Sequence, residues 1–206
     1  GYGSFNAGAT QYQYAHDDYI FEAISDTGGI DTLDLSDFNT SLTVSLDSGN
    51  WLDLGQDHTV TNGLGDRNLF IPDNVYIENL IGGSGSDTLT GNAYDNILTG
   101  GVGNDTLVGG LGQDTAVFSG AFEDYQIEEE LVAGVTYLKV TDNRSDSPDG
   151  VSRLALDMDY LQFSDGTQTY GQVSTVSVDE YTVSTPIDNS AVVNQISESA
   201  TNGDLV

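Results

Sequence analysis

The feature that most constrains the fold is a nine-residue period that runs from Gly82 to Val117. Four units follow one another without a gap and read GGSGSDTLT, GNAYDNILT, GGVGNDTLV and GGLGQDTAV. Each begins with Gly, has Asp or Asn sixth and an apolar residue eighth. A low-complexity Gly/Asp linker would have no reason to keep that apolar position. The period therefore predicts a repeat architecture with one local structure per unit.

The residue types within a unit indicate a tight loop followed by a short strand. Glycines in the first six positions permit close turns whose carbonyl oxygens point inward. The sixth residue adds a polar side chain, and the last three positions form a minimal strand with one inward side chain. The sixth residues are Asp87, Asn96, Asp105 and Asp114, and the eighth are Leu89, Leu98, Leu107 and Ala116.

This nonapeptide resembles the hemolysin-type calcium-binding repeat of RTX (repeats-in-toxin) proteins. The fold expected is a right-handed parallel β-roll in which two units make one turn. Units one and three then stack on one edge, and units two and four on the other. Stacked loops would offer the several oxygen ligands that Ca²⁺ takes. The repeats contain no His or Cys, so zinc and copper are poor candidates.

The resemblance places the calcium ligands at positions two, four and six of each unit. Positions two and four supply carbonyl oxygens, and position six supplies its side chain. The residues are Gly83, Gly85, Asp87, Asn92, Tyr94, Asn96, Gly101, Gly103, Asp105, Gly110, Gly112 and Asp114. Because Asn96 is neutral, we expect its site to bind calcium more weakly than the others.

Two stretches before the repeats are similar to the entry of the repeat domain in serralysin-type secreted metalloproteases. They are YIFEAISDTGGIDTLDLSDF, at residues 19–38, and IPDNVYIENLIGGSGSD, at residues 71–87. The resemblance implies that Asp26, Gly28, Gly29 and Asp31 hold a calcium at the N-terminal end of the roll. It also implies that Glu78 and the carbonyl of Tyr76 close a site facing unit one. For Asp26–Asp31, a β-turn capped by Asp is the alternative.

The flanking segments predict more β-structure, and the chain is expected to be all-β. Leu42–Asp47 alternates as a half-buried strand does, and Trp51 is expected in the core. After the repeats, alternation and turn residues predict an antiparallel β cap. The expected divisions are an N-terminal β section over 1–81, the repeats over 82–117, the cap over 118–170, and a linker with the start of a following module over 171–206.

The composition of the chain limits the classes of partner that it is expected to bind. The formal net charge is −29, and Asp outnumbers Glu by 25 to 8. Such a chain is not expected to bind nucleic acid or anionic membrane surfaces, and its self-repulsion favours the uptake of cations. There is no Cys, so a metal is the expected substitute for disulfides. No apolar run is long enough to predict a membrane span.

Catalysis is not expected of this chain. His16 and His58 are its only histidines, so the HExxH zinc motif of the metalloproteases is absent. There is also no GxSxG nucleophile elbow, and no Lys follows the glycines as in a phosphate-binding loop. The chain is interpreted as a non-catalytic module, for which a secreted metalloprotease and a polysaccharide-active enzyme are the candidate attached domains.

Two classes of function remain open. The first is a calcium-triggered folding module of a bacterial protein exported by type I secretion machinery, which folds outside the cell and supports an attached domain. The second is a calcium-scaffolded binding module for polysaccharide or a cell surface, as in a large adhesin or surface-layer protein. Tyr12 and Tyr14 are candidates for stacking on sugars, although several tyrosines are expected simply to face outward from strands.

Overall fold

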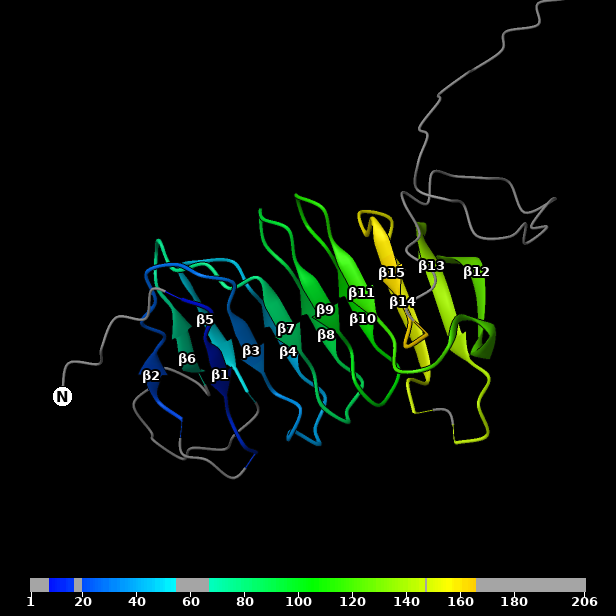
Figure 1. Ribbon diagram of the computed structural model, residues 1–206, viewed down its shortest axis with the longest axis horizontal. Helices are drawn as coiled ribbons and strands as arrows, with labels where there is room; N and C mark the ends of the chain where they lie inside the picture. The colour runs from blue at the N-terminus through cyan, green and yellow to red at the C-terminus, as the bar shows by residue number, and fades with distance from the viewer. Residues whose placement is uncertain (1–7, 17–19, 55–66, 147, 166–206) are drawn as a thin grey trace, which may run out of the picture.

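The computed structural model describes residues 8–16, 20–54, 67–146 and 148–165, which form two β-sheets, one short 3₁₀ helix and no α-helix. Figure 1 shows the strands crossing the long axis from the N-terminal to the C-terminal end. The six-stranded sheet is entirely parallel and has the order β1 (Gln11–Gln13), β3 (Thr32–Asp34), β7 (Asn79–Ile81), β9 (Ile97–Thr99), β11 (Thr115–Val117) and β15 (Tyr160–Gln162). The nine-stranded sheet has the order β12 (Tyr125–Val132), β13 (Val135–Asp142), β14 (Val151–Ala155), β10 (Thr106–Val108), β8 (Thr88–Thr90), β4 (Thr43–Ser45), β5 (Asn50–Asp53), β6 (Arg67–Ile71) and β2 (Glu22–Ala23).

The four repeats wind alternately between the two sheets. Strand β8 of unit one pairs in parallel with β10 of unit three, so Leu89 lies opposite Leu107. Strand β9 of unit two pairs in parallel with β11 of unit four, so Leu98 lies opposite Ala116. One turn of the coil therefore takes eighteen residues. The prediction of an all-β parallel roll with two units per turn is confirmed.

The core is a double row of inward side chains between the two sheets. One row follows the six-stranded sheet, and the other follows the nine-stranded sheet. The first consists of Leu33, Leu80, Leu98, Ala116 and Leu161, and the second of Val44, Leu89, Leu107 and Leu154, all almost completely buried. Full burial of one such leucine contributes about 2 kcal/mol relative to exposure. The eighth position of the repeat is thus what binds the two sheets together.

The N-terminal section departs from the expectations for its aromatic residues. Trp51 is 40% exposed and does not belong to the core. Its neighbour Leu52 is buried, so the alternation of β5 turns Trp51 to the outer face, where it stacks on Phe21 and Phe70. Tyr14 is buried, and its hydroxyl group is hydrogen-bonded to the carboxyl group of Glu22.

The C-terminal section is an antiparallel hairpin followed by one more coil of the roll. Strands β12 and β13 pair antiparallel, as the turn at Gly134 predicts, and β13 pairs antiparallel with β14. Strand β14 then adds in parallel to β10, and β15 adds in parallel to β11. Residues 151–162 therefore extend the roll, a role that the cap prediction did not include. The linker expected over 171–206 lies outside the described residues.

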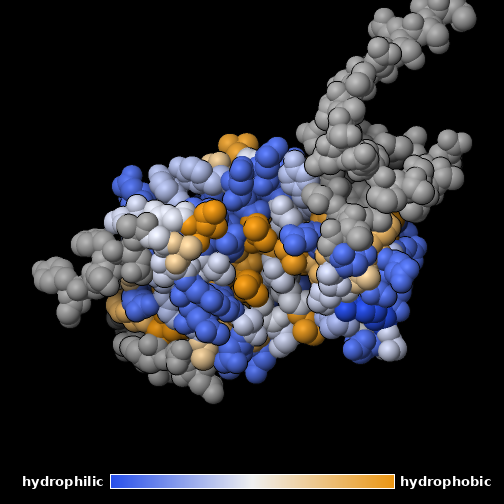
Figure 2. Space-filling model, in the orientation of Figure 1, coloured by the Kyte–Doolittle hydropathy of each residue, from blue (hydrophilic) through white to orange (hydrophobic). Residues whose placement is uncertain are grey.

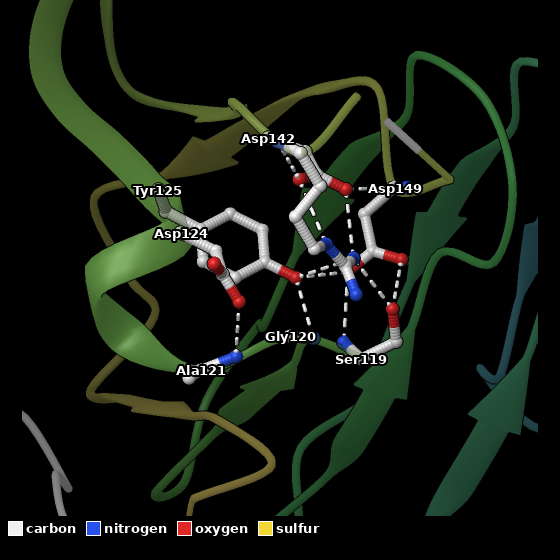
Figure 3. A network of polar contacts seen from close by, with 8 residues as sticks. Ser119, Gly120, Ala121, Asp124, Tyr125, Asp142 and Asp149 are labelled. Carbon is white, nitrogen blue, oxygen red and sulfur yellow. Dashed lines mark hydrogen bonds and ion pairs between the residues drawn. The ribbon is translucent and has the colours of Figure 1, made fainter. Parts of the chain in front are cut away.

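A buried polar network attaches the hairpin to the segment that directly follows the last repeat (Figure 3). The Tyr125 hydroxyl donates to Asp149 Oδ2 at 2.5 Å and accepts the Gly120 N–H at 2.7 Å. The Arg144 guanidinium donates to both carboxylate oxygens of Asp142, at 2.9 and 2.7 Å. Burial by itself raises the pKa of Asp142, but the bonds from Arg144 outweigh it, and the net pKa lies below its ordinary value.

Hydrophilic residues cover much of the described surface in Figure 2, interrupted by several apolar patches. The strand residues that face outward include several Thr, such as both outward residues of β8 and Thr106 of β10. None of the described helical residues forms a segment that is long and apolar enough to cross a membrane.

Candidate metal centres

The loops between the strands stack along the two edges of the roll. We call the side where the chain passes from the six-stranded to the nine-stranded sheet the first edge. The opposite side is the second edge. The first edge carries loops 35–42, 82–87, 100–105 and 148–150, and the second carries loops 26–31, 72–78, 91–96, 109–114 and 156–159. Each pair of adjacent loops encloses a space lined by backbone and by the sixth-position side chain.

A recurring hydrogen bond sets the position of these side chains. The carboxylate of one coil accepts the backbone N–H of the equivalent residue in the coil before it. The donor and acceptor pairs are Thr10 to Asp31, Asp31 to Glu78, Leu42 to Asp87, Asp87 to Asp105, Asn96 to Asp114 and Asp114 to Asp159, at 2.7 to 3.0 Å. Each acid therefore lies in the space between its own loop and the preceding one.

The stacked loops are too close to admit side chains at the glycine positions. Gly103 has φ = 138°, and a Cβ built on it would lie 2.0 Å from the carbonyl oxygen of Gly85 in the preceding coil. Only glycine tolerates both this backbone conformation and this approach. Backbone carbonyls therefore line the space in which the carboxylates lie.

We expect the substitution Gly103→Ala to lower the free energy of unfolding at saturating calcium by about 3 kcal/mol. The matched control is Gly134→Ala in the β12–β13 turn, where φ is 87° and no atom lies within 4 Å of the added Cβ. That control incurs the conformational cost alone, about 1 kcal/mol. Denaturant unfolding of both variants measures the difference, and equal losses would show that the loops are not tightly stacked.

Several of the buried acids have an oxygen with no hydrogen-bond partner among the described residues. These are Asp31 Oδ2, Asp105 Oδ2 and Asp114 Oδ2. Burial, reinforced by the charges of neighbouring carboxylates, raises the pKa of Asp105 to about 6 and that of Asp114 to about 6. A buried, ionised oxygen without a partner is costly unless a cation neutralises it.

These spaces fit calcium better than other metals. Among the described residues, no three His, Cys, Asp or Glu side chains gather to hold an ion by themselves. An ion between two loops would therefore draw most of its ligands from backbone carbonyls, with one or two carboxylates. Calcium accepts such mixed oxygen ligands, whereas zinc prefers His and Cys. The carboxylate oxygens of Asp31, Asp105 and Asp114 that lack a hydrogen-bond partner supply the negative charge that this ligand set requires.

The N-terminal candidate residues lie together on the second edge. Asp26 Oδ1 accepts the Gly28 N–H at 2.6 Å, and Glu78 Oε2 accepts the Asp31 N–H at 2.7 Å. Burial, together with the charges of Asp31 and Asp26, raises the pKa of Glu78. The local turn expected as the alternative is thus present, and it leaves Asp31 Oδ2 free of hydrogen bonds.

The prediction that Glu78 and Tyr76 face unit one is wrong. Strand β7 pairs with β9 of unit two, and the Tyr76 ring contacts that of Tyr94 at 4.6 Å between centroids. Successive units alternate between edges, so unit one, which follows β7 directly along the chain, lies on the other edge. On the second edge, the next loop after 72–78 is that of unit two.

Sequence reasoning missed the last loop of the second edge. Asp159 is in register with Asp114, and the carboxylate of Asp157 accepts the N–H groups of Gly109 and Gly110, each at 3.1 Å. Their segment, LDMDY, lacks the glycines of the repeat, so it does not stand out as a loop. The signal available was the spacing of Asp159 and Leu161, which repeats that of Asp114 and Ala116.

Residues 81–116 match the family model of the RTX calcium-binding nonapeptide repeat, in four copies. The chain carries RTX calcium-binding repeats. The match coincides with the loops and strands that build the central coils of the roll. It does not include the loop of Asp157 and Asp159 or the β12–β13 hairpin.

The chain is also similar to a serralysin from Proteus mirabilis, with 41% identity over 78 residues. The matched stretch covers 38% of this chain and 14% of the length of that protein. It falls in the repeat region and does not include the protease domain. The similarity predicted from residues 19–38 and 71–87 is therefore confirmed for the repeat region.

Proposed function

We propose that this chain is a calcium-dependent RTX β-roll module, without catalytic activity, that folds outside the cell and supports the secretion and stability of an attached domain. The observation that carries the proposal is the set of buried carboxylate oxygens without partners, on Asp31, Asp105 and Asp114, in spaces lined by backbone carbonyls. The negative charge of these oxygens is not balanced by a positive charge in the described loops that hold them. A hard cation bound there would balance it.

The proposed ligands follow the two edges. On the first edge they are the side chains of Asp87 and Asp105 with carbonyls of Gly83, Gly85, Gly101 and Gly103. On the second edge they are Asp26, Asp31 and Glu78 with carbonyls of Gly28, Gly29 and Tyr76, then Asp114 with carbonyls of Asn92, Tyr94, Gly110 and Gly112, and finally Asp157 and Asp159. In the loop 148–150 at the end of the first edge, Arg144 lies 3.4 Å from Asp149 and replaces the cation.

The role in secretion follows from where calcium is available. In a cytoplasm poor in calcium the uncompensated carboxylates would keep the chain unfolded and threadable through a type I channel. Outside, calcium at roughly 100 times its dissociation constant adds about 2.7 kcal/mol per bound ion. The serralysin similarity supports an extracellular bacterial location and an attached passenger domain. Polysaccharide binding loses the support of Tyr12 and Tyr14, whose hydroxyls bond to Asp26 and Glu22.

The test is a calcium titration of the chain followed by far-UV circular dichroism, with magnesium as the control. We expect little β-structure in EGTA, a cooperative gain of signal with calcium, and no comparable gain with magnesium, which prefers a small octahedral site. A spectrum that is the same in excess EGTA and in calcium would refute the proposal.

A further inference from the structure

Unit two differs from the other repeats at the positions that face the space next to loop 72–78. It has Asn92 at position two and Asn96 at position six, where the other units have Gly and Asp. Both side chains are buried, Asn92 to 8% exposure and Asn96 to 0%. Buried amides need partners for both their oxygen and their NH₂ group.

Both amides are bonded within this layer. Asn92 Nδ2 donates to the carbonyls of Ile77 at 2.8 Å and Leu46 at 3.4 Å, and its Oδ1 accepts the Tyr94 N–H at 2.9 Å. Asn96 Nδ2 donates to the carbonyl of Glu78 at 3.0 Å, and its Oδ1 accepts the Asn92 N–H at 2.7 Å. We call these two side chains the amide bridge.

The amide bridge occupies the position that an acid occupies elsewhere. In the next layer of the same edge, Asp114 has an oxygen without a partner, whereas in this layer neither amide has one. The carbonyls of Ile77 and Glu78 already accept amide hydrogens. These hydrogens carry partial positive charge and oppose a cation at the same carbonyls.

We infer that no calcium binds between loop 72–78 and the loop of unit two, and that the amide bridge holds these coils together in its place. The inference rests on the proposed function and refines it. The calcium ions form two separate groups on the second edge, one around Asp31 and Glu78 and one from Asp114 onward. The layer between them keeps its stability without metal.

Two variants test this, with native mass spectrometry counting bound calcium and thermal unfolding at saturating calcium. Asn92→Ala keeps the backbone carbonyl that is a proposed ligand beside Asp114 but leaves the carbonyls of Ile77 and Leu46 without their amide donor, so we expect the melting temperature to fall by about 5 °C or more. Asn143→Ala, in an exposed position of the cap, is the control and should leave both unchanged. The double variant Asn92→Gly/Asn96→Asp restores the common pattern and should bind one calcium more than the wild type.

The outcomes separate the inference from the proposed function. A double variant with the same calcium count as the wild type, or an Asn92→Ala variant with an unchanged melting temperature, overturns the amide bridge while leaving a calcium-binding roll. A wild-type chain that binds no calcium overturns both. An added ion in the double variant supports both.

Discussion

Replacing Asp105 by Asn is expected to raise the calcium concentration at the folding midpoint about tenfold or more, because calcium affinity depends on the number of charged ligands. In the wild type the Asp87 N–H donates to Asp105 Oδ1 at 2.9 Å. The amide oxygen of Asn can accept the same N–H, so the loop should keep its shape. What disappears is the charge on Asp105 Oδ2, the oxygen without a partner.

The same substitution should have the opposite effect on the calcium-free chain. Burial raises the pKa of Asp105 to about 6, which means that the fold without metal favours the neutral side chain. Asn is permanently neutral, so Asp105→Asn should be more stable than the wild type in EGTA with sucrose as a stabilising osmolyte. Circular dichroism in both conditions measures the two shifts.

The control for this variant is Glu129→Gln, which removes one charge at an exposed position of β12. It corrects for the general relief of self-repulsion in a chain of net charge −29. If Asp105→Asn moves the calcium midpoint no further than Glu129→Gln does, Asp105 is not a ligand. Asp114→Asn should behave as Asp105→Asn does, since its carboxylate has the same environment on the other edge.

The second large effect is a pH dependence whose sign reverses with calcium. Burial first, and nearby carboxylates second, raise the pKa of Asp105 and Asp114 from 3.8 to about 6. Without calcium, these groups contribute stability that is complete below about pH 4 and is lost as the pH rises through about 6. In EGTA the fold should therefore be more stable at pH 5 than at pH 7.5.

With calcium the dependence runs the other way, because bound carboxylates must be ionised. A group with a pKa near 6 weakens the binding of its own ion about tenfold between pH 7.5 and pH 5, and because the two groups lie on opposite edges and serve different ions, the calcium midpoint should rise about tenfold. Calcium titrations at the two pH values provide the measurement. The double variant Asp105→Asn/Asp114→Asn should lose most of this dependence, and its retention would assign the effect to other acids.

The sequence was sufficient to predict the central coils because each unit repeats the same loop and the same short strand. Gly103 and Asp105 have the residue types that their loop demands, and Leu107 fills the one inward position of its strand. Loop, ligand and core could be inferred from nine residues at a time. The structure then added the direction of the carboxylates, each toward the coil before its own.

In segments that lack the glycines of the repeat, the structure could be predicted less well from the sequence. The loop of Asp157 and Asp159 closes the second edge with N–H bonds from Gly109 and Gly110, contacts that join residues 47 and 48 positions apart. Trp51 was expected inside because large aromatics are usually buried, yet its strand has Leu52 in the inward position. Both cases depend on which face or edge a residue occupies, and tertiary pairing decides that.

The alternation of the units between two edges restricts how such a roll can change in length. One inserted nonapeptide would carry every later segment to the opposite side, so that β14 would join the six-stranded sheet and β15 the nine-stranded sheet. Two inserted units restore the original alignment and only lengthen the molecule. Relatives of this domain that keep β14 in the same sheet as β4, β5 and β6 should therefore differ by even numbers of repeats between Glu78 and the hairpin.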